Sequence, residues 1–342
     1  MSQPKQQPKY QVTVLGGGTG SFTVLTGLKK HDSLDLTAIV AMTDDGGSTG
    51  ILRDQLGILP VGDLRQCLVA LSDVPNLWRE LFNARFEEGD GLKGHNLGNL
   101  ILAKLKDLEG GSYQRALANA EKLLHVRGRV LPVTFDNVRL VAETTDGKEL
   151  YGEHLIDARD APLKRVFFDP KKPKTNPKAL EVIADSHVVI LAPGDIYTSL
   201  LPTILMPGVR EALAETRAPV VYVCNLMAQK NHTEDFSVVD FVDLLHKQAG
   251  QEFLDIVVYN TQQPPSRVLQ KYTREGKPVS FSSEDFGSRR QHFQGHELLC
   301  QELSKPVTGD QLERTFIRHD PDKLAHVLYK LIQGNRAYRK KH

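Results

Sequence analysis

The chain has 342 residues, of which 40% are hydrophobic and 25% are charged, a balance typical of globular proteins. Its net charge of +1 argues against a nucleic-acid-binding protein whose affinity depends on a global positive field. The three cysteines lie far apart, which excludes a zinc knuckle or a disulfide framework and suits a reducing cytoplasm. No apolar stretch approaches the roughly 18 residues of a membrane span, so we expect a cytoplasmic protein without one.

Both ends of the chain are polar. Residues 1–9 lack the apolar centre of a signal peptide and are predicted to form a flexible tail. Residues 336–342 form a basic tail, which indicates a solvated helix end rather than a site for an anionic partner.

Five apolar runs end abruptly in small or polar residues, and helix-like segments alternate with them. The runs cover residues 12–15, 38–42, 188–192, 220–224 and 256–259. A buried parallel strand is apolar on both faces, so it appears as a continuous run. The alternation predicts an α/β protein with a Rossmann-like, doubly wound and mainly parallel sheet. In such sheets the ligand crevice lies beyond the carboxyl ends of the strands.

A glycine-rich loop, residues 16–20, follows the first run and precedes a segment with helical spacing. Glycines permit close backbone approach, and the first turn of a helix offers unpaired N–H groups to an anion. The dinucleotide fingerprint G-x-G-x-x-G is incomplete because Ser21 stands where the third glycine belongs, and no Walker lysine follows. The alternative to a phosphate site is a purely structural turn. The candidate phosphate or nucleotide contacts are Gly17, Gly18, Thr19 and Gly20.

The second run ends in the most specific stretch of the chain, an acidic and glycine-rich loop. Its adjacent carboxylates, Asp44 and Asp45, repel each other unless a sugar hydroxyl, a divalent cation such as Mg²⁺ or an arginine compensates. Asp44 can alternatively accept a hydrogen bond from a ribose hydroxyl. The interpretation without a ligand is a solvated acidic turn. The candidate ligand-binding residues here are Thr43, Asp44, Asp45, Gly46, Gly47, Ser48 and the nearby arginines Arg53 and Arg65.

Two further polar motifs follow. Asp63 lies in the first turn of a predicted helix, so it serves either as a favourable charge for the helix dipole or as a ligand contact. His95 has no partner at metal-ligand spacing, which favours a structural role, but it directly precedes a predicted helix over 96–108. Asn96 is expected to cap that helix.

One region breaks the alternation. Asp146 and Gly147 separate two short apolar-polar runs, which is a strong hairpin signal. We therefore predict a small antiparallel β-hairpin insertion over 129–162, between core segments 10–128 and 163–335 that form one nucleotide-binding unit. A helix is expected over 198–215.

Together these stretches resemble the gluconeogenesis-factor (YvcK-type) proteins, a branch of the 2-phospho-L-lactate transferase (CofD-like) superfamily. The resemblance extends from residue 12 to about residue 331. The matching motifs, in order, are residues 16–20, 44–50, 62–66, 94–99, 193–199, 222–227 and 318–320.

The resemblance implies a bacterial, cytoplasmic, Rossmann-like protein that binds UDP-sugars such as UDP-N-acetylglucosamine. It also implies links to gluconeogenic growth, cell-wall synthesis and cell shape, with a cell-wall synthesis protein as an expected partner; a homodimer stays open. Tyr272 would stack on the uracil and Arg318 would pair with the diphosphate. The other binding residues implied by the motifs, besides Asp44, Asp45, Asp63 and the glycine loop, are His95, Asn96, Asn99, Gly194, Asp195, Tyr197, Thr198, Ser199 and Asn225.

The sister branch transfers a phospholactyl group onto a deazaflavin, with a divalent metal held by carboxylates. This chain has residues 62–67 where the transferases carry a Ser-Pro-Asp-x-Asp-Thr stretch, which disfavours deazaflavin recognition. Three functions therefore compete: a nucleotide-sugar-binding regulator, a transferase of phosphorus-containing groups with Asp44, Asp45 or Asp63 as metal or catalytic residues, and an NAD-dependent oxidoreductase. We favour the regulator, without enzymatic activity.

Overall fold

The computed structural model describes residues 10–334 except 231, 273–275 and 301–316. The two expected tails, residues 1–9 and 336–342, lie outside the described residues. Within the described ranges, no helix has both the length and the apolar character needed to cross a bilayer.

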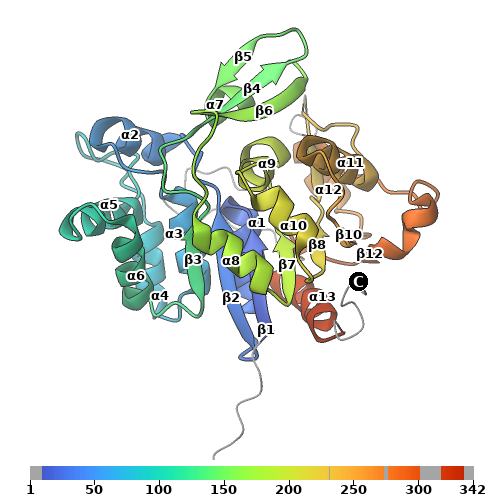
Figure 1. Cartoon of the computed structure of the whole chain (residues 1–342), viewed down its shortest axis with the longest axis horizontal. Helices are drawn as coiled ribbons and strands as arrows, with labels where there is room; N and C mark the ends of the chain where they lie inside the picture. The colour runs from blue at the N-terminus through green and yellow to red at the C-terminus, as the bar shows by residue number, and fades with distance from the viewer. Residues whose placement is uncertain (1–9, 231, 273–275, 301–316, 335–342) are drawn as a thin grey trace, which may run out of the picture.

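A seven-stranded parallel sheet forms the centre of the molecule, in the order β12-β10-β8-β7-β1-β2-β3 (Figure 1). Five of its strands are the five apolar runs, and the fold class expected from them is confirmed. The core strands β7 and β8 are buried along their whole length, as expected of a sheet covered on both faces. The strands are β1 (Tyr10–Leu15), β2 (Leu34–Val40), β3 (Arg129–Pro132), β7 (Val188–Leu191), β8 (Val220–Val223), β10 (Ile256–Asn260) and β12 (Phe293–His296).

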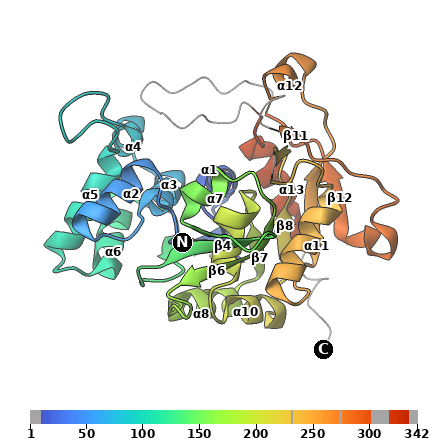
Figure 2. The same cartoon turned by 90° about the horizontal axis from the view of Figure 1, so that it is seen from above.

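Helices cover both faces of this sheet. Helix α1 packs against α3 and α13 on one face, whereas α8 packs against α10 and α9 against α11 on the other (Figure 2). The helices are α1 (Gly18–Leu28), α2 (Gly47–Leu56), α3 (Gly62–Leu71), α4 (Asn76–Asn83), α5 (Leu97–Leu108), α6 (Tyr113–Leu123), α7 (Glu153–Asp157), α8 (Pro177–Asp185), α9 (Leu201–Ile204), α10 (Val209–Glu215), α11 (Val238–Ala249), α12 (Ser266–Tyr272) and α13 (Pro321–Gly334), with a π-helix η1 (Ile196–Leu200) and a 3₁₀-helix η2 (Gly287–His292).

The strand order reverses beside β1. The chain first runs outward through β2 and β3, and then returns to place β7, β8, β10 and β12 on the other side of β1. In doubly wound sheets such a switch point opens a crevice at the carboxyl ends of the two central strands. The loops that follow β1 and β7 therefore flank the expected ligand position.

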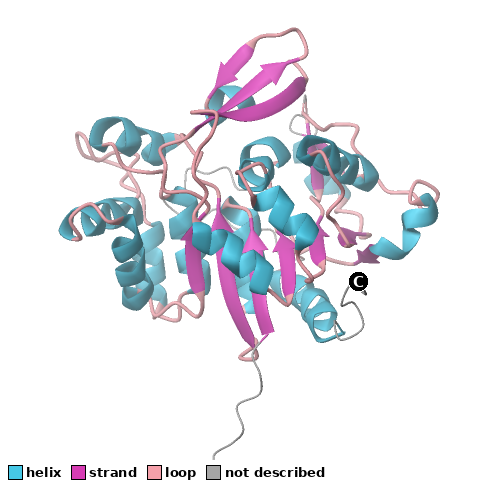
Figure 3. Ribbon diagram, viewed as in Figure 1, coloured by secondary structure: helices cyan, strands magenta, loops and turns pink. Residues whose placement is uncertain are grey.

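A small antiparallel sheet stands beyond the carboxyl ends of the main strands, whose arrowheads point toward it (Figure 3). The predicted hairpin is confirmed: β4 (Arg139–Thr144) pairs with β5 (Glu149–Tyr151), and Gly147 supplies the positive φ of +87° in the turn. A third strand, β6 (Leu163–Asp169), pairs with β4. A separate two-stranded sheet joins β9 (Met227–Gln229) to β11 (Gly276–Pro278).

The boundaries of the insertion differ from the expected 129–162. Residues 129–132 are β3, which pairs in parallel with β2 and closes the edge of the main sheet. Residues 163–169 belong to the small sheet instead of the core. Four residues ending in Pro132 make a weak strand signal, because proline is disfavoured in strands and is tolerated only at positions such as a sheet edge.

The helix expected over 198–215 is divided into η1, α9 and α10. Pro202 stands in the first turn of α9, and Gly208, with a φ of +86°, precedes α10. Proline favours the start of a helix, and a glycine with positive φ interrupts a helix. The apolar periodicity of this stretch continues across both residues, so it predicted one helix.

Candidate functional site

The loops after β1 and β7 touch at the carboxyl rim of the sheet. A Cβ added to Gly20 would lie 1.5 Å from the carbonyl oxygen of Pro193, so only glycine permits this approach. A Cβ added to Gly17 would lie 1.9 Å from Asp63 Oδ2. The glycine loop is therefore packed between the loop after β7 and the first turn of α3.

Asp44 and Asp63 both lie at the start of α3, where Asp44 is next to Gly62 and Asp63 is next to Gly17 of the glycine loop. Burial, followed by the charge of Asp44, raises the pKa of Asp63 to about 7, while a hydrogen bond from the Gly18 N–H acts in the opposite direction. Burial also raises the pKa of Asp44, although the Gly46 N–H donates to its Oδ1 over 2.8 Å and the Thr49 hydroxyl donates as well. Two neighbouring carboxylates are a donor set that Mg²⁺ accepts, so this pair fits a divalent cation.

Asp45 points away from its neighbour and toward the insertion. Its Oδ1 accepts a hydrogen bond of 3.1 Å from the backbone N–H of His154, in the first turn of α7. A carboxylate at a helix N-terminus satisfies an otherwise unpaired donor and interacts favourably with the helix dipole. Asp45 thus ties the loop after β2 to the small sheet.

Asp195 begins the segment after β7. Its Oδ1 accepts from the backbone N–H groups of Tyr197 and Thr198, both over 2.8 Å. Asn225, after β8, braces the same loop: its Oδ1 accepts from the Gly194 N–H and its Nδ2 donates to the Gly194 carbonyl, over 3.1 and 2.7 Å. The ends of β7 and β8 are therefore held together by polar side chains at the rim.

Carboxylates of the chain itself meet the backbone N–H groups at three helix starts along this rim. Asp63 meets the start of α1, Asp45 the start of α7 and Asp195 the start of η1. A ligand phosphate was expected to use such N–H groups directly. At the Gly18 N–H, the hydrogen-bond acceptor is instead the side chain of Asp63.

Residues of α7 add charge that the sequence reasoning missed. Burial and the charges of Asp44, Asp63, Asp157 and Asp195 raise the pKa of Glu153 well above its usual value. Burial and the charge of Asp195 raise the pKa of Asp157 to about 7, although its side chain keeps contact with water. Residues 153 and 157 are one helical turn apart, but a five-residue helix is too short for that spacing to be a signal in the sequence.

The sequence of the chain matches a known protein family. A family model described as 2-phospho-L-lactate transferase CofD matches residues 12–297. The chain belongs to the CofD family. The resemblance expected from the motifs is thereby confirmed.

Proteins named as gluconeogenesis factors are similar to this CofD-family chain along nearly its full length. The gluconeogenesis factor of Bacillus subtilis is 39% identical over 329 residues, covering 96% of this chain and 99% of that protein. A putative gluconeogenesis factor of Aquifex aeolicus is 38% identical over 333 residues, covering 95% and 98%. A crystal structure of a UPF0052-family protein from Bacillus halodurans superposes with a TM-score of 0.86 at 35% identity, covering 93% of this chain and 99% of that one.

Both candidate arginines of this CofD-family protein hold neighbouring segments. Arg53 Nη2 donates to Asn137 Oδ1 over 2.6 Å and to the Val138 carbonyl over 2.7 Å, at the entry to the insertion. Arg65 donates to Asn99 Oδ1 over 3.0 Å and to the Phe82 carbonyl over 3.1 Å. Arg65 also lowers the pKa of Asp44 and Asp63 through its charge, after larger opposing contributions from burial.

The motif around His95 forms a buried polar network. The Ser48 hydroxyl lies 3.2 Å from His95 Nδ1 and accepts from the Asn96 N–H over 3.2 Å. Asn96 caps α5, as predicted, because its Oδ1 accepts from the Asn99 N–H over 3.2 Å. These contacts give the motif a structural role of its own, next to the acidic loop.

The remaining candidates divide between the two ends of the rim. Thr43 and Thr198 are buried, Thr19 and Ser199 are half-buried, and the exposed Gly46 and Gly47 lead into α2. The Tyr272 side chain lies outside the described part of the structure.

Arg318 lies at the far end of the rim, where its carbonyl accepts from the Cys300 N–H over 2.9 Å. The neighbouring Ile317 packs against Leu226, just beyond β8. A small open pocket between β8 and β10 is lined by residues that include Asn225, Tyr259, Asn260, Gln262 and Phe281.

Proposed function

We propose that the protein is a cytoplasmic regulator that binds a nucleotide-sugar, such as UDP-N-acetylglucosamine, at the carboxyl rim of the main sheet. The observation that carries the proposal is the meeting of three loops at the switch point, beside Asp44 and Asp63. Because its relatives are named gluconeogenesis factors, we place its role in growth on gluconeogenic carbon sources, with cell-wall synthesis and cell shape downstream.

The two ends of the rim suit the two ends of such a ligand. The pocket beside Asn225 and Asn260 is also lined by Phe281, whose exposed ring offers aromatic surface to a nucleobase. At the other end, Asp44 and Asp63 would hold a Mg²⁺ ion. A bound Mg²⁺ supplies positive charge that a diphosphate can contact, which offsets the repulsion between phosphate and carboxylates.

Calorimetric titration tests this proposal. UDP-N-acetylglucosamine, NAD and GDP are each titrated with and without Mg²⁺, and we expect saturable binding of the UDP-sugar, strengthened by Mg²⁺. Asp63→Asn should weaken that binding about tenfold or more. Asp185→Asn is the matched control, because Asp185 is exposed and precedes β7 at the opposite edge of the sheet. Saturable binding of NAD alone would refute the proposal.

A transferase of phosphorus-containing groups is the second candidate, favoured by the family and by the Asp44–Asp63 pair. The test is incubation with a phospholactyl donor, a deazaflavin acceptor and Mg²⁺, with mass-spectrometric detection of product. We expect no turnover. Product that disappears in Asp63→Asn would establish the transferase instead.

A further inference from the structure

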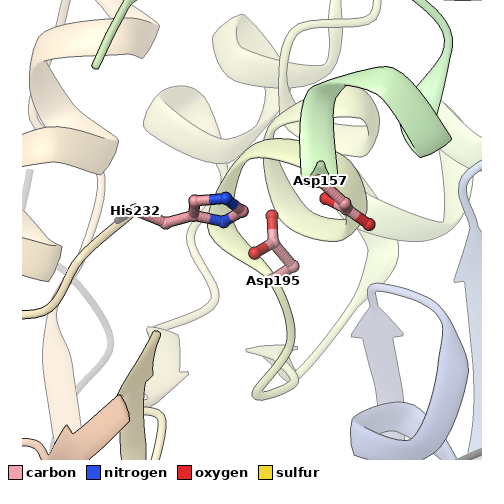
Figure 4. A group of neighbouring side chains, drawn as sticks. All are labelled: Asp157, Asp195 and His232. Carbon is pink, nitrogen blue, oxygen red and sulfur yellow. The ribbon is translucent and has the colours of Figure 1, made fainter. Parts of the chain in front are cut away.

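A second group of donor atoms lies at the rim, outside the residues singled out by the motifs as metal ligands. Asp157 ends α7, Asp195 follows β7, and His232 follows β9. One ligand atom from each side chain lies within 4.8 Å of the other two. Figure 4 shows the His232 ring directed at Asp195, with Asp157 close by.

The imidazole of His232 is held in an orientation that suits a ligand. Its Nδ1 lies 3.0 Å from Gln229 Oε1, an amide oxygen that only accepts, so Nδ1 can donate its proton there while Nε2 binds a metal ion. Metal-bound histidines commonly donate their other ring N–H to such an oxygen. Burial, followed by the charge of Arg159, lowers the pKa of His232, whereas Asp195 and the carbonyls of Arg159 and Asp157 act in the opposite direction.

Negative charge exceeds positive charge around this group. The carboxyl groups of Glu153, Asp157 and Asp195 interact unfavourably with one another when they are ionised. Arg159 is the neighbouring cation, and it is already engaged: its guanidinium lies 4.8 Å from the centroid of the Tyr197 ring and donates to the Ile156 carbonyl. One guanidinium does not balance the carboxylates of both Asp157 and Asp195, so a divalent cation would relieve the remaining repulsion.

We propose that Asp157, Asp195 and His232 bind a divalent first-row transition metal, of the Mn²⁺ or Zn²⁺ class. Two carboxylates with one imidazole form a mixed oxygen and nitrogen set, which suits these ions better than Ca²⁺. Asp195 Oδ1 is engaged by the N–H groups of η1, which leaves Oδ2 for the ion. The site differs from the Asp44–Asp63 pair and does not depend on the nucleotide-sugar.

The first measurement is the binding of Mn²⁺ to the full chain without nucleotide. It is followed by equilibrium dialysis with metal analysis of the protein. His232→Ala and Asp195→Asn should each weaken Mn²⁺ binding more than about tenfold. Asparagine keeps an acceptor for the Tyr197 and Thr198 N–H groups, so Asp195→Asn preserves the helix start. His154→Ala is the matched control, because His154 is exposed on α7 and lies outside the donor group.

Pulsed electron paramagnetic resonance of the bound Mn²⁺ identifies the ligands. We expect ¹⁴N coupling from a directly bound imidazole, present in Asp63→Asn and absent from His232→Ala. Absence of Mn²⁺ binding by the folded protein would overturn the proposal. So would bound Mn²⁺ without ¹⁴N coupling, or Mn²⁺ binding lost in Asp63→Asn and retained in His232→Ala. Because nucleotide is left out, failure of UDP-sugar binding would not alter any of these outcomes.

Discussion

The main sheet and the insertion contribute to the same rim in different ways. The main sheet packs Gly20 directly on the backbone of Pro193, and it packs Gly17 on the side chain of Asp63. The insertion places Glu153 and Asp157 on a five-residue helix, α7, whose first turn hydrogen-bonds to Asp45. The comparison teaches that one half of the site is fixed by close packing, whereas the other half depends on a polar link that solvent can compete for.

The largest expected effect is at the packed contact. Gly20→Ala brings a Cβ within 1.5 Å of the Pro193 carbonyl oxygen, so the loops after β1 and β7 must separate. We expect a loss of about 3 kcal/mol in the free energy of unfolding, measured by urea denaturation. Gly334→Ala, where a Cβ meets nothing within 4 Å, is the control and should change stability by less than about 0.5 kcal/mol. Equal effects of the two substitutions would contradict close packing at Gly20.

An intermediate effect is expected from the pH dependence of stability. The folded-state pKa of Asp63, about 7, lies above its ordinary value of 3.8, so the folded state holds its proton longer than the unfolded state. The contribution of this proton to the free energy of unfolding is present at low pH and is lost as the pH rises from about 4 to about 7. Asp63→Asn should therefore gain about 1 kcal/mol over the parent protein at pH 7.5 and little at pH 4.5, since partial solvent contact reduces the full linkage value. A pH-independent difference between the two proteins would refute this.

The smallest global effect should come from the polar link. Asp45→Ala removes the acceptor for the His154 N–H, and loss of such an exposed helix-cap bond costs about 0.5 kcal/mol. Hydrogen exchange should accelerate in residues 153–157 and stay unchanged in β1. Asp54→Ala, which breaks only an exposed ion pair with Arg139, is the control. Unchanged exchange in α7 after Asp45→Ala would mean that the Asp45 hydrogen bond does not hold α7 in place.

The same contrast explains what the sequence predicted. Continuous apolar runs identify β1 and β7 because burial on both faces leaves a pattern in neighbouring residues. Asp146 and Gly147 identify the hairpin because its turn chemistry is local. The fold could therefore be predicted from short stretches of chain.

The candidate site could be predicted only in part. The carboxylates that follow β2 were found from their loop, whereas Glu153 and Asp157 lie on a helix too short to show periodicity. His232 reaches Asp195 through the return of the chain after β9, and no spacing along the sequence encodes that meeting. Contacts between distant segments depend on the assembled sheet, so sequence patterns could not reveal them.

The adjacent pair after β2 has a consequence for variation at these positions. Asp44 faces Gly62 at the start of α3 and Asp45 faces α7, although the two carry the same side chain. Neither can substitute for the other, because consecutive side chains leave the backbone in different directions. A substitution that is harmless at one position can thus be damaging at the next.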